Sequence, residues 1–309
     1  MMILGIDTSN YTTSIALFDG TDIICKRHLL PVKEGYRGLR QSDALFNHIK
    51  QLPELFEDIY FGDKNIDAVS VSTSPRNTEG SYMPVFLAGE NLGRSIASIL
   101  NVPLYRFSHQ EGHIMAGLYS ANSYELLSRP FISVHLSGGT TEILYTNYNN
   151  GRFETEIIGK TLDISVGQLI DRVGVDLGFL FPCGKEVDAL STQSKNPILL
   201  PVSVKSADIN FSGAETKCKE FYKVCDKSDI CKGILLCIAK SLTKSINYCL
   251  NQYKTDSVLY VGGVASNTFL REYLKEYINA ESVFASTELS TDNAVGTAIL
   301  GYLKKQSEV

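Results

Sequence analysis

The sequence predicts an α/β protein made of two related halves. Near the N-terminus, three predicted strands are separated by two polar turns, and the same order of strand, turn, strand, turn, strand returns after residue 129. Both triplets precede segments whose apolar residues have helical spacing, which is typical of α/β architecture. No low-complexity linker lies between the halves. We therefore expect two domains, residues 1–128 and 129–309, that share a cleft.

In the first half, short apolar segments alternate with turn residues. The predicted elements are strands 3–7, 14–18, 23–26 and 68–72 and helices 41–59 and 85–100. Asp19-Gly20 is a good hairpin turn because glycine tolerates positive φ. The second predicted helix ends before Pro103, which cannot continue a helix.

In the second half, the pattern restarts with a polar glycine turn and a second hairpin turn at residues 149–151. The predicted elements are strands 130–136, 142–146, 153–158 and 257–261 and helices 165–177, 217–253, one after Ser266, and 292–304. Ala294, Ala298 and Gly301 in the last helix suit close packing, because small side chains let backbones approach.

The composition limits the functional classes. With 309 residues, 44% of them hydrophobic, the chain can form two domain-sized cores. No window approaches the roughly 18 uninterrupted apolar residues of a membrane span. The N-terminus lacks the basic region of a signal peptide, so we expect a cytoplasmic protein without membrane contact. Seven cysteines, an odd number without a Cys-x-x-Cys pair, indicate reduced thiols rather than disulfides or a cysteine-ligated zinc site.

The net charge of −5 argues against a general electrostatic affinity for nucleic acid. A local excess of lysine between residues 205 and 244 is a candidate surface for RNA. Such a run is more commonly the solvated face of a helix, and both interpretations stay open.

Three glycine- or hydroxyl-rich turns follow predicted buried strands. They are residues 8–13, 137–141 and 262–267. Backbone N–H groups in such turns can bind a phosphate, and the third also presents a helix N-terminus. The simpler alternative is that the first two are ordinary hairpins and that Asn267 caps a helix instead of holding a ribose hydroxyl.

The sharpest local signal is His109-Gln110-Glu111-Gly112-His113. If residues 106–119 are helical, His109 and His113 lie one turn apart on the same face, where two neutral imidazoles suit zinc or iron. A zincin protease needs glutamate next to the first histidine, and Gln110 occupies that position. Proteolysis is therefore disfavoured.

Three carboxylates could add to such a site. Asp7 ends the first strand, Asp171 lies in the helix after Asp163, and Asp292 opens the last helix. For Asp292 we weigh two roles, an N-cap or a third metal ligand that leaves positions open for substrate. The local sequence does not decide between them.

Taken together and in this order, the motifs resemble those of the TsaD tRNA threonylcarbamoyl transferases, formerly misnamed O-sialoglycoprotein endopeptidases. The resemblance covers essentially the whole chain. The matching motifs are residues 5–9, 109–113, 137–141, 211–213, 262–267 and 291–294. It implies the actin-like ATPase fold of actin, sugar kinases and Hsp70, with two RNase H-like domains and an interdomain cleft.

The resemblance also implies the site residues. One divalent metal (iron or zinc, or magnesium) would bind to His109, His113 and Asp292. An adenine nucleotide (ATP, AMP or threonylcarbamoyl-adenylate) would contact His135, Leu136, Ser137, Gly138, Gly139, Asp171, Gly184 and Asn267. Asp7 and Asp171 are the candidate catalytic residues.

The reaction implied by the resemblance moves a threonylcarbamoyl group from the adenylate to N6 of adenosine in tRNA. Partners would be small proteins of a tRNA-modification complex, or a second copy of the chain in a homodimer. The sequence departs from the family's motifs at Tyr11, Thr12, Arg76 and Thr140. These departures keep two alternatives open, a divergent paralogue that modifies a non-tRNA acceptor and a nucleotide-bound partner without catalysis.

Overall fold

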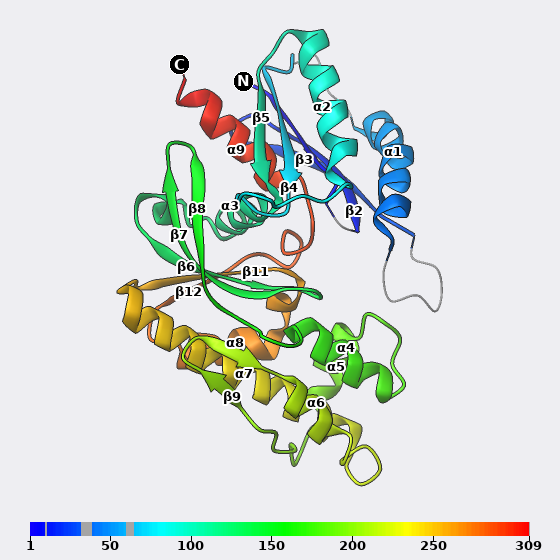
Figure 1. Cartoon of the computed structure of the whole chain (residues 1–309), viewed down its shortest axis with the longest axis vertical. Coiled ribbons are helices and arrows are strands. Elements are labelled where there is room, and N and C mark those ends of the chain that lie inside the picture. Colours follow the sequence, from blue (N-terminus) through cyan, green and yellow to red (C-terminus); the bar gives the residue numbers. More distant parts are fainter. Residues whose placement is uncertain (10, 32–38, 60–64, 309) are drawn as a thin grey trace. The chain divides into compact units, whose positions relative to one another are not determined.

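The computed structural model describes residues 1–9, 11–31, 39–59 and 65–308, so Asn10 in the first predicted turn lies outside the described residues. The chain divides into two compact units (Figure 1). Unit 1 comprises Met1–Asn122, Tyr148–Glu154 and Thr291–Val309, and unit 2 comprises Ser123–Asn147 and Thr155–Ser290.

Unit 1 contains a five-stranded sheet in the order β3-β2-β1-β4-β5. Its strands are β1 (Ile3–Asp7), β2 (Thr12–Phe18), β3 (Ile23–Leu29), β4 (Ala68–Ser74) and β5 (Leu104–Ser108). The first three strands are antiparallel, whereas β4 pairs in parallel with both β1 and β5. The predicted triplet of strands is therefore confirmed, and β1 and β2 are buried along their whole length.

Four helices complete the described part of unit 1. They are α1 (Gln41–Asp58), α2 (Phe86–Leu100), α3 (His109–Ala121) and α9 (Val295–Gln306). The last helix, red in Figure 1, lies against β1, since a Cβ added to Gly5 would meet the Ala298 Cβ at 2.8 Å. A Cβ at Gly301 would meet the Ser70 Cβ at 2.7 Å. The predicted close packing of this helix is thus explained by its contact with the first sheet.

The C-terminal segment therefore belongs to unit 1, although the sequence pattern places residues 129–309 in the second domain. The hairpin tip Tyr148–Glu154 is also part of unit 1. The sequence does not predict that these two segments belong to unit 1, because their placement depends on tertiary contacts. One such contact is the hydrogen bond of 2.7 Å that the Ser70 hydroxyl donates to the Thr297 carbonyl. The N-terminal boundary, between Asn122 and Ser123, lies close to the predicted position.

Unit 2 repeats the same sheet pattern in the order β12-β11-β6-β7-β8. Its strands are β6 (Phe131–Leu136), β7 (Thr141–Asn149), β8 (Arg152–Lys160), β11 (Ser257–Val261) and β12 (Glu281–Phe284), and β9 (Ser203–Lys205) and β10 (Asp208–Asn210) form a separate ladder. As in unit 1, a hairpin precedes parallel pairing, here of β6 with β11 and of β11 with β12. The prediction of two related α/β halves is confirmed.

Five α-helices belong to the described part of unit 2. They are α4 (Val166–Asp176), α5 (Gly184–Ser191), α6 (Ser212–Cys218), α7 (Lys227–Tyr253) and α8 (Thr268–Tyr277). They enclose one large apolar core that includes the fully buried Phe211 and Tyr260. The seven cysteines all carry free thiols, as predicted. Across the described ranges, no helix combines the length and apolar character that a bilayer span requires.

Candidate metal and nucleotide sites

Helix α3 carries both histidines of the predicted metal site. It begins at His109 because Ser108 is its N-cap: the Ser108 hydroxyl accepts from Glu111 N at 3.2 Å, and the Glu111 carboxylate accepts from Ser108 N at 2.7 Å. This reciprocal capping box satisfies two N–H groups that the helix cannot pair. The predicted helix start at residue 106 is wrong, because residues 106–108 belong to β5. The one-turn spacing survives, with the ring centroids of His109 and His113 4.3 Å apart.

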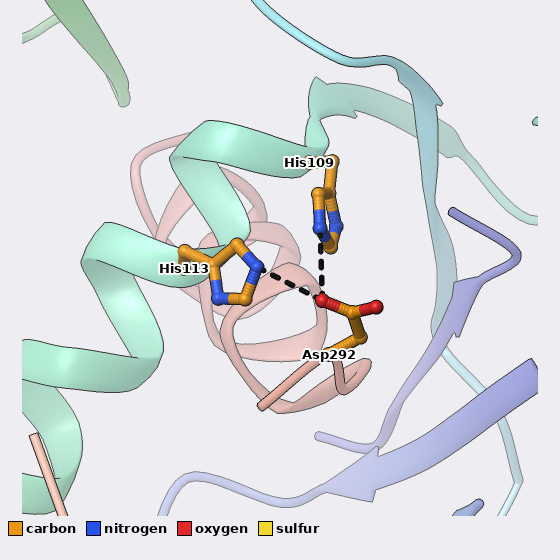
Figure 2. A group of neighbouring side chains, drawn as sticks. All are labelled: His109, His113 and Asp292. Atoms are coloured by element: carbon orange, nitrogen blue, oxygen red, sulfur yellow. Dashed lines mark ion pairs between the residues drawn. The ribbon is translucent and has the colours of Figure 1, made fainter. Parts of the chain in front are cut away.

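One carboxylate oxygen of Asp292 faces both imidazoles (Figure 2). Its Oδ1 atom is 3.4 Å from His109 Nε2 and 3.3 Å from His113 Nε2. The three ligand atoms all lie within 4.8 Å of one another. Asp292 does not cap α9, whose N-cap is Ala294. Two imidazole nitrogens and one carboxylate oxygen that converge in this way fit a divalent first-row metal with positions open for other ligands.

Asp7 contacts the Nδ1 edge of the His109 ring, opposite to the edge that faces Asp292. Its Oδ2 atom lies 3.3 Å from His109 Nδ1 and accepts a hydrogen bond of 2.9 Å from the Ser9 hydroxyl. The Asp7 side chain is completely buried at the end of β1. In metal sites, a carboxylate at this position selects the tautomer that leaves the opposite nitrogen free for the ion. Asp7 therefore contacts the edge of the His109 ring opposite to the nitrogen that faces Asp292.

The pKa values report a strong attraction for positive charge at this position. Burial lowers the pKa of His109, but the Asp7 and Asp292 carboxylates outweigh it and raise that pKa to about 10. Burial raises the pKa of Asp292, whereas hydrogen bonds from His109 and His113 bring it well below the usual carboxyl range. A proton on His109 balances one of these two negative charges, and a bound cation would compete with that proton.

Two glycines set the distance between α3 and α9. A Cβ added to Gly296 would lie 1.9 Å from the Gly112 carbonyl oxygen, and one added to Gly112 would lie 3.0 Å from the Thr297 hydroxyl. The helices therefore cross with their backbones in close contact. Since Asp292 directly precedes α9 and the histidines lie on α3, this crossing brings the three side chains together.

In unit 2, the predicted phosphate turn joins β6 to β7. His135 and Leu136 end β6, and the Ser137 hydroxyl accepts from Thr140 N at 3.0 Å. Nothing lies within 4 Å of a Cβ added to Gly138 or Gly139, so both residues are open on that side, whereas the backbone of Gly138 packs closely against Gly167. Such an open turn is compatible with the predicted phosphate contact.

The remaining predicted nucleotide residues have structural contacts of their own. Asp171 accepts a hydrogen bond of 2.8 Å from Cys183 N, and burial raises the pKa of its carboxyl against the lowering effect of that bond. Gly184 begins α5 with open space around it. Asn267 caps α8 by accepting from Leu270 N at 2.9 Å, so the simpler of its two predicted roles is confirmed.

The sequence patterns do not identify the contact between Glu111 and Arg152. These two side chains form an ion pair of 3.0 Å, and Glu111 lies between the two histidines in sequence. The sequence Ser-x-x-Glu over residues 108–111 is the signal of a capping box and could have located the true helix start. No local signal identifies Arg152, because it approaches Glu111 only through tertiary structure.

Comparison with known proteins agrees with the motif pattern. Residues 33–299 match the sequence model of the family TsaD, described as tRNA N6-adenosine threonylcarbamoyltransferase. The protein of that name from Buchnera aphidicola is 30% identical over 99% of this chain and 93% of its own length. Its counterpart from Thermosipho africanus is 28% identical over 98% of this chain and 94% of its own length.

Solved structures support the fold at much lower identity. Component A of the (R)-2-hydroxyglutaryl-CoA dehydratase of Acidaminococcus fermentans superposes with a TM-score of 0.60 at 17% identity, and each chain covers 100% of the other. A ROK family glucokinase from Streptomyces griseus gives 0.55 at 10% identity, over 97% of this chain and 99% of that one. Both have the actin-like ATPase fold, so that prediction is confirmed.

Proposed function

The chain belongs to the TsaD family of tRNA N6-adenosine threonylcarbamoyltransferases, and from this membership we propose that it transfers a threonylcarbamoyl group from an adenylate to N6 of adenosine in tRNA. The observation that carries the proposal is the convergence of His109, His113 and Asp292. A family member without the reaction would not need to keep three side chains from distant parts of the sequence as one ligand set.

In this proposal His109, His113 and Asp292 hold one divalent metal. Two imidazoles favour iron or zinc over magnesium, which prefers oxygen ligands. When bound, such an ion would supply a Lewis acid to the reaction. Asp7 accepts the Nδ1 proton of His109 and keeps Nε2 turned toward the ion, which is a positioning role.

The adenylate donor is assigned to unit 2. The turn of Ser137, Gly138 and Gly139 offers backbone N–H groups to its phosphate, and the open space at both glycines supports this assignment. His135, Leu136, Asp171, Gly184 and Asn267 complete the proposed set. The Asn267 side-chain oxygen caps α8, and its NH2 group can donate to a ligand.

The transfer itself needs little activation of the acceptor. The adenine N6 amine forms a bond to the carbamoyl carbon, the bond from that carbon to the AMP phosphate oxygen breaks, and N6 loses one proton. Since N6 is an uncharged amine, the rate gain comes mainly from holding it against the carbamoyl carbon and from stabilising the charge on the departing phosphate. Small partner proteins are part of the proposal because the family resemblance implies them.

A second candidate keeps the same donor and changes the acceptor. It is favoured by the departures from the family's motifs at Tyr11, Thr12, Arg76 and Thr140. Thr140 lies in the proposed phosphate turn itself, where its N–H is already bonded to the Ser137 hydroxyl. A change at this position can alter which substrate the turn accommodates.

The test is a reconstituted reaction with threonine, bicarbonate, ATP, an adenylate-forming enzyme and unmodified tRNA. Mass spectrometry of the digested tRNA should reveal threonylcarbamoyladenosine with the wild-type chain and a strong loss with His113→Ala. A matched control is His28→Ala, because the His28 side chain is 40% exposed and its Nδ1 atom lies 3.9 Å from a Glu54 carboxylate oxygen. Product on an added small amine, with none on tRNA, would favour the second candidate. The absence of any carbamoylated product with every partner combination would reject both.

A further inference from the structure

Glu111 lies between the two histidines in sequence, but its side chain contacts Arg152 and Ser108. Its side chain is 1% exposed, and Arg152 approaches it with two nitrogens, Nε at 3.3 Å from Oε1 and Nη2 at 3.0 Å from Oε2. The Oε2 atom also accepts from the Ser108 backbone N and hydroxyl, at 2.7 and 2.9 Å. One carboxylate thus joins the first turn of α3 to Arg152.

The pair is asymmetric in its exposure to water. Arg152 is 42% exposed and its guanidinium lies 5.5 Å from the centroid of the Phe107 ring. Glu111 is fully enclosed, and a buried carboxylate without a cation is costly. Without Arg152, the Glu111 carboxylate that caps α3 would be buried without this cation.

Arg152 is part of a hairpin tip that also contacts α9. The tip is Tyr148–Glu154, which belongs to unit 1, whereas the rest of β7 and β8 belongs to unit 2. Lys304 of α9 donates to the Asn150 carbonyl at 3.4 Å, and a Cβ added to Gly151 would meet Lys304 Cδ at 2.9 Å. One tip thus touches both helices next to the ligand set, α3 through Glu111 and α9 through Lys304.

We infer that Arg152 is a positioning residue for the candidate metal site, acting through Glu111 on the first turn of α3. His109 is the first residue of that helix, so loosening the turn moves its ring relative to His113 and Asp292. This inference rests on the proposed function only in requiring that the three side chains bind a metal. By this inference Arg152, which lies outside the motifs that match the family, also controls the affinity for the metal.

The simpler role for the pair is to fasten the hairpin tip, and the two roles differ in what they change. A fastening role alters the stability of the tip and leaves the affinity for metal unchanged. A positioning role lowers the affinity for metal and changes the ligand field. Titration with Co²⁺ measures the affinity for metal, and its visible absorption spectrum reports the geometry of its ligands.

The experiment titrates the metal-free full chain with Co²⁺ at a temperature where thermal unfolding shows every variant to be folded. Arg152→Met removes the charge and keeps an apolar side chain over Phe107. The matched control is Arg106→Met, because Arg106 is 47% exposed and pairs with Glu90 at 2.9 Å in the same unit. Arg152→Lys keeps the positive charge but cannot contact Glu111 with two nitrogens. It replaces the methionine variant in the titration if that variant does not fold.

We expect Arg152→Met to bind Co²⁺ about tenfold more weakly and with an altered spectrum. A loss of this size is usual when a residue that positions the metal ligands is substituted. Arg152→Lys should recover part of the loss, and Arg106→Met should match the wild type. Glu111→Gln combined with Arg152→Met should be no weaker than the single Arg152 variant.

Three results would overturn the inference. Wild-type affinity and spectrum in Arg152→Met would show that the pair of Glu111 and Arg152 attaches the hairpin tip and does not position the ligands. Equal losses in Arg152→Met and Arg106→Met would show a general effect of net charge. A wild-type chain that binds no Co²⁺ would reject the proposed metal site itself, and the inference with it.

Discussion

The Oδ2 atom of Asp7 lies 3.3 Å from Nδ1 of His109, on the ring edge opposite to Nε2, which faces Asp292. The imidazole is therefore held between two carboxylates from opposite ends of the sequence. Asp7 ends the first strand and Asp292 precedes the last helix. This arrangement defines the orientation of the His109 ring.

The first prediction concerns the ligand set. His109→Ala should remove about one equivalent of tightly bound metal per chain, because one ligand is lost and the remaining two bind far less strongly. Metal analysis of protein purified without chelators measures this. His28→Ala, which removes a half-buried histidine outside the proposed ligand set, should keep the wild-type metal content. Equal metal content in wild type and His109→Ala would contradict the ligand assignment.

The second prediction concerns Asp7. Asp7→Asn keeps an oxygen for the His109 Nδ1 proton but removes the negative charge, so the affinity for metal should fall by about 10- to 100-fold. Competition with a coloured chelator gives the dissociation constants. Asp43→Asn, on the exposed side of α1, is the control for loss of one acidic charge. Unaltered affinity in Asp7→Asn would remove Asp7 from the site.

The third prediction concerns the crossing of α3 and α9. Gly296→Ala places a methyl group 1.9 Å from a backbone oxygen, so we expect a loss of about 3 kcal/mol in the free energy of unfolding. Urea denaturation measures it. Gly213→Ala lies in α6 with nothing within 4 Å of the new methyl and should be neutral or stabilising. Similar stability of the two variants would show that the helices can separate without cost.

The fourth prediction concerns pH. Burial raises the pKa of Asp163, but N–H groups of Phe211 and Ser212 bond to its carboxylate and hold the pKa below the usual value. A folded-state pKa lower than the unfolded one adds stability above the unfolded value of about 3.9, and this is lost as the pH falls through the folded pKa. The stability difference between wild type and Asp163→Asn should be constant near neutral pH and shrink below about pH 4. A difference that grows in acid would contradict this role.

The general architecture could be predicted from the sequence because strands and turns have short-range signals. Alternation of apolar runs with turn residues identified both strand triplets, and the φ values of +51° at Asn150 and +80° at Gly151 confirm the second hairpin turn. The spacing of His109 and His113 is likewise a local property of any helix. These features do not depend on the rest of the chain.

The remaining features depend on contacts between distant segments. Residues 106–108 have no strong strand signal and become part of β5 because they pair with β4. Asp292 could be an N-cap or a ligand on local grounds, and only the family resemblance favoured the ligand role. The Glu111–Arg152 pair has no sequence signal at all, since 41 positions separate its members.

The division of the chain has a practical consequence for experiments on isolated pieces. Unit 1 is assembled from three separated stretches of sequence, with Tyr148–Glu154 and Thr291–Val309 following Met1–Asn122. An N-terminal fragment cut at Asn122 would retain both histidines but lack Asp292, Arg152 and the glycine face of α9. Limited digestion that releases the C-terminal twenty or so residues should therefore abolish ion binding while leaving the histidine-bearing segment intact in sequence.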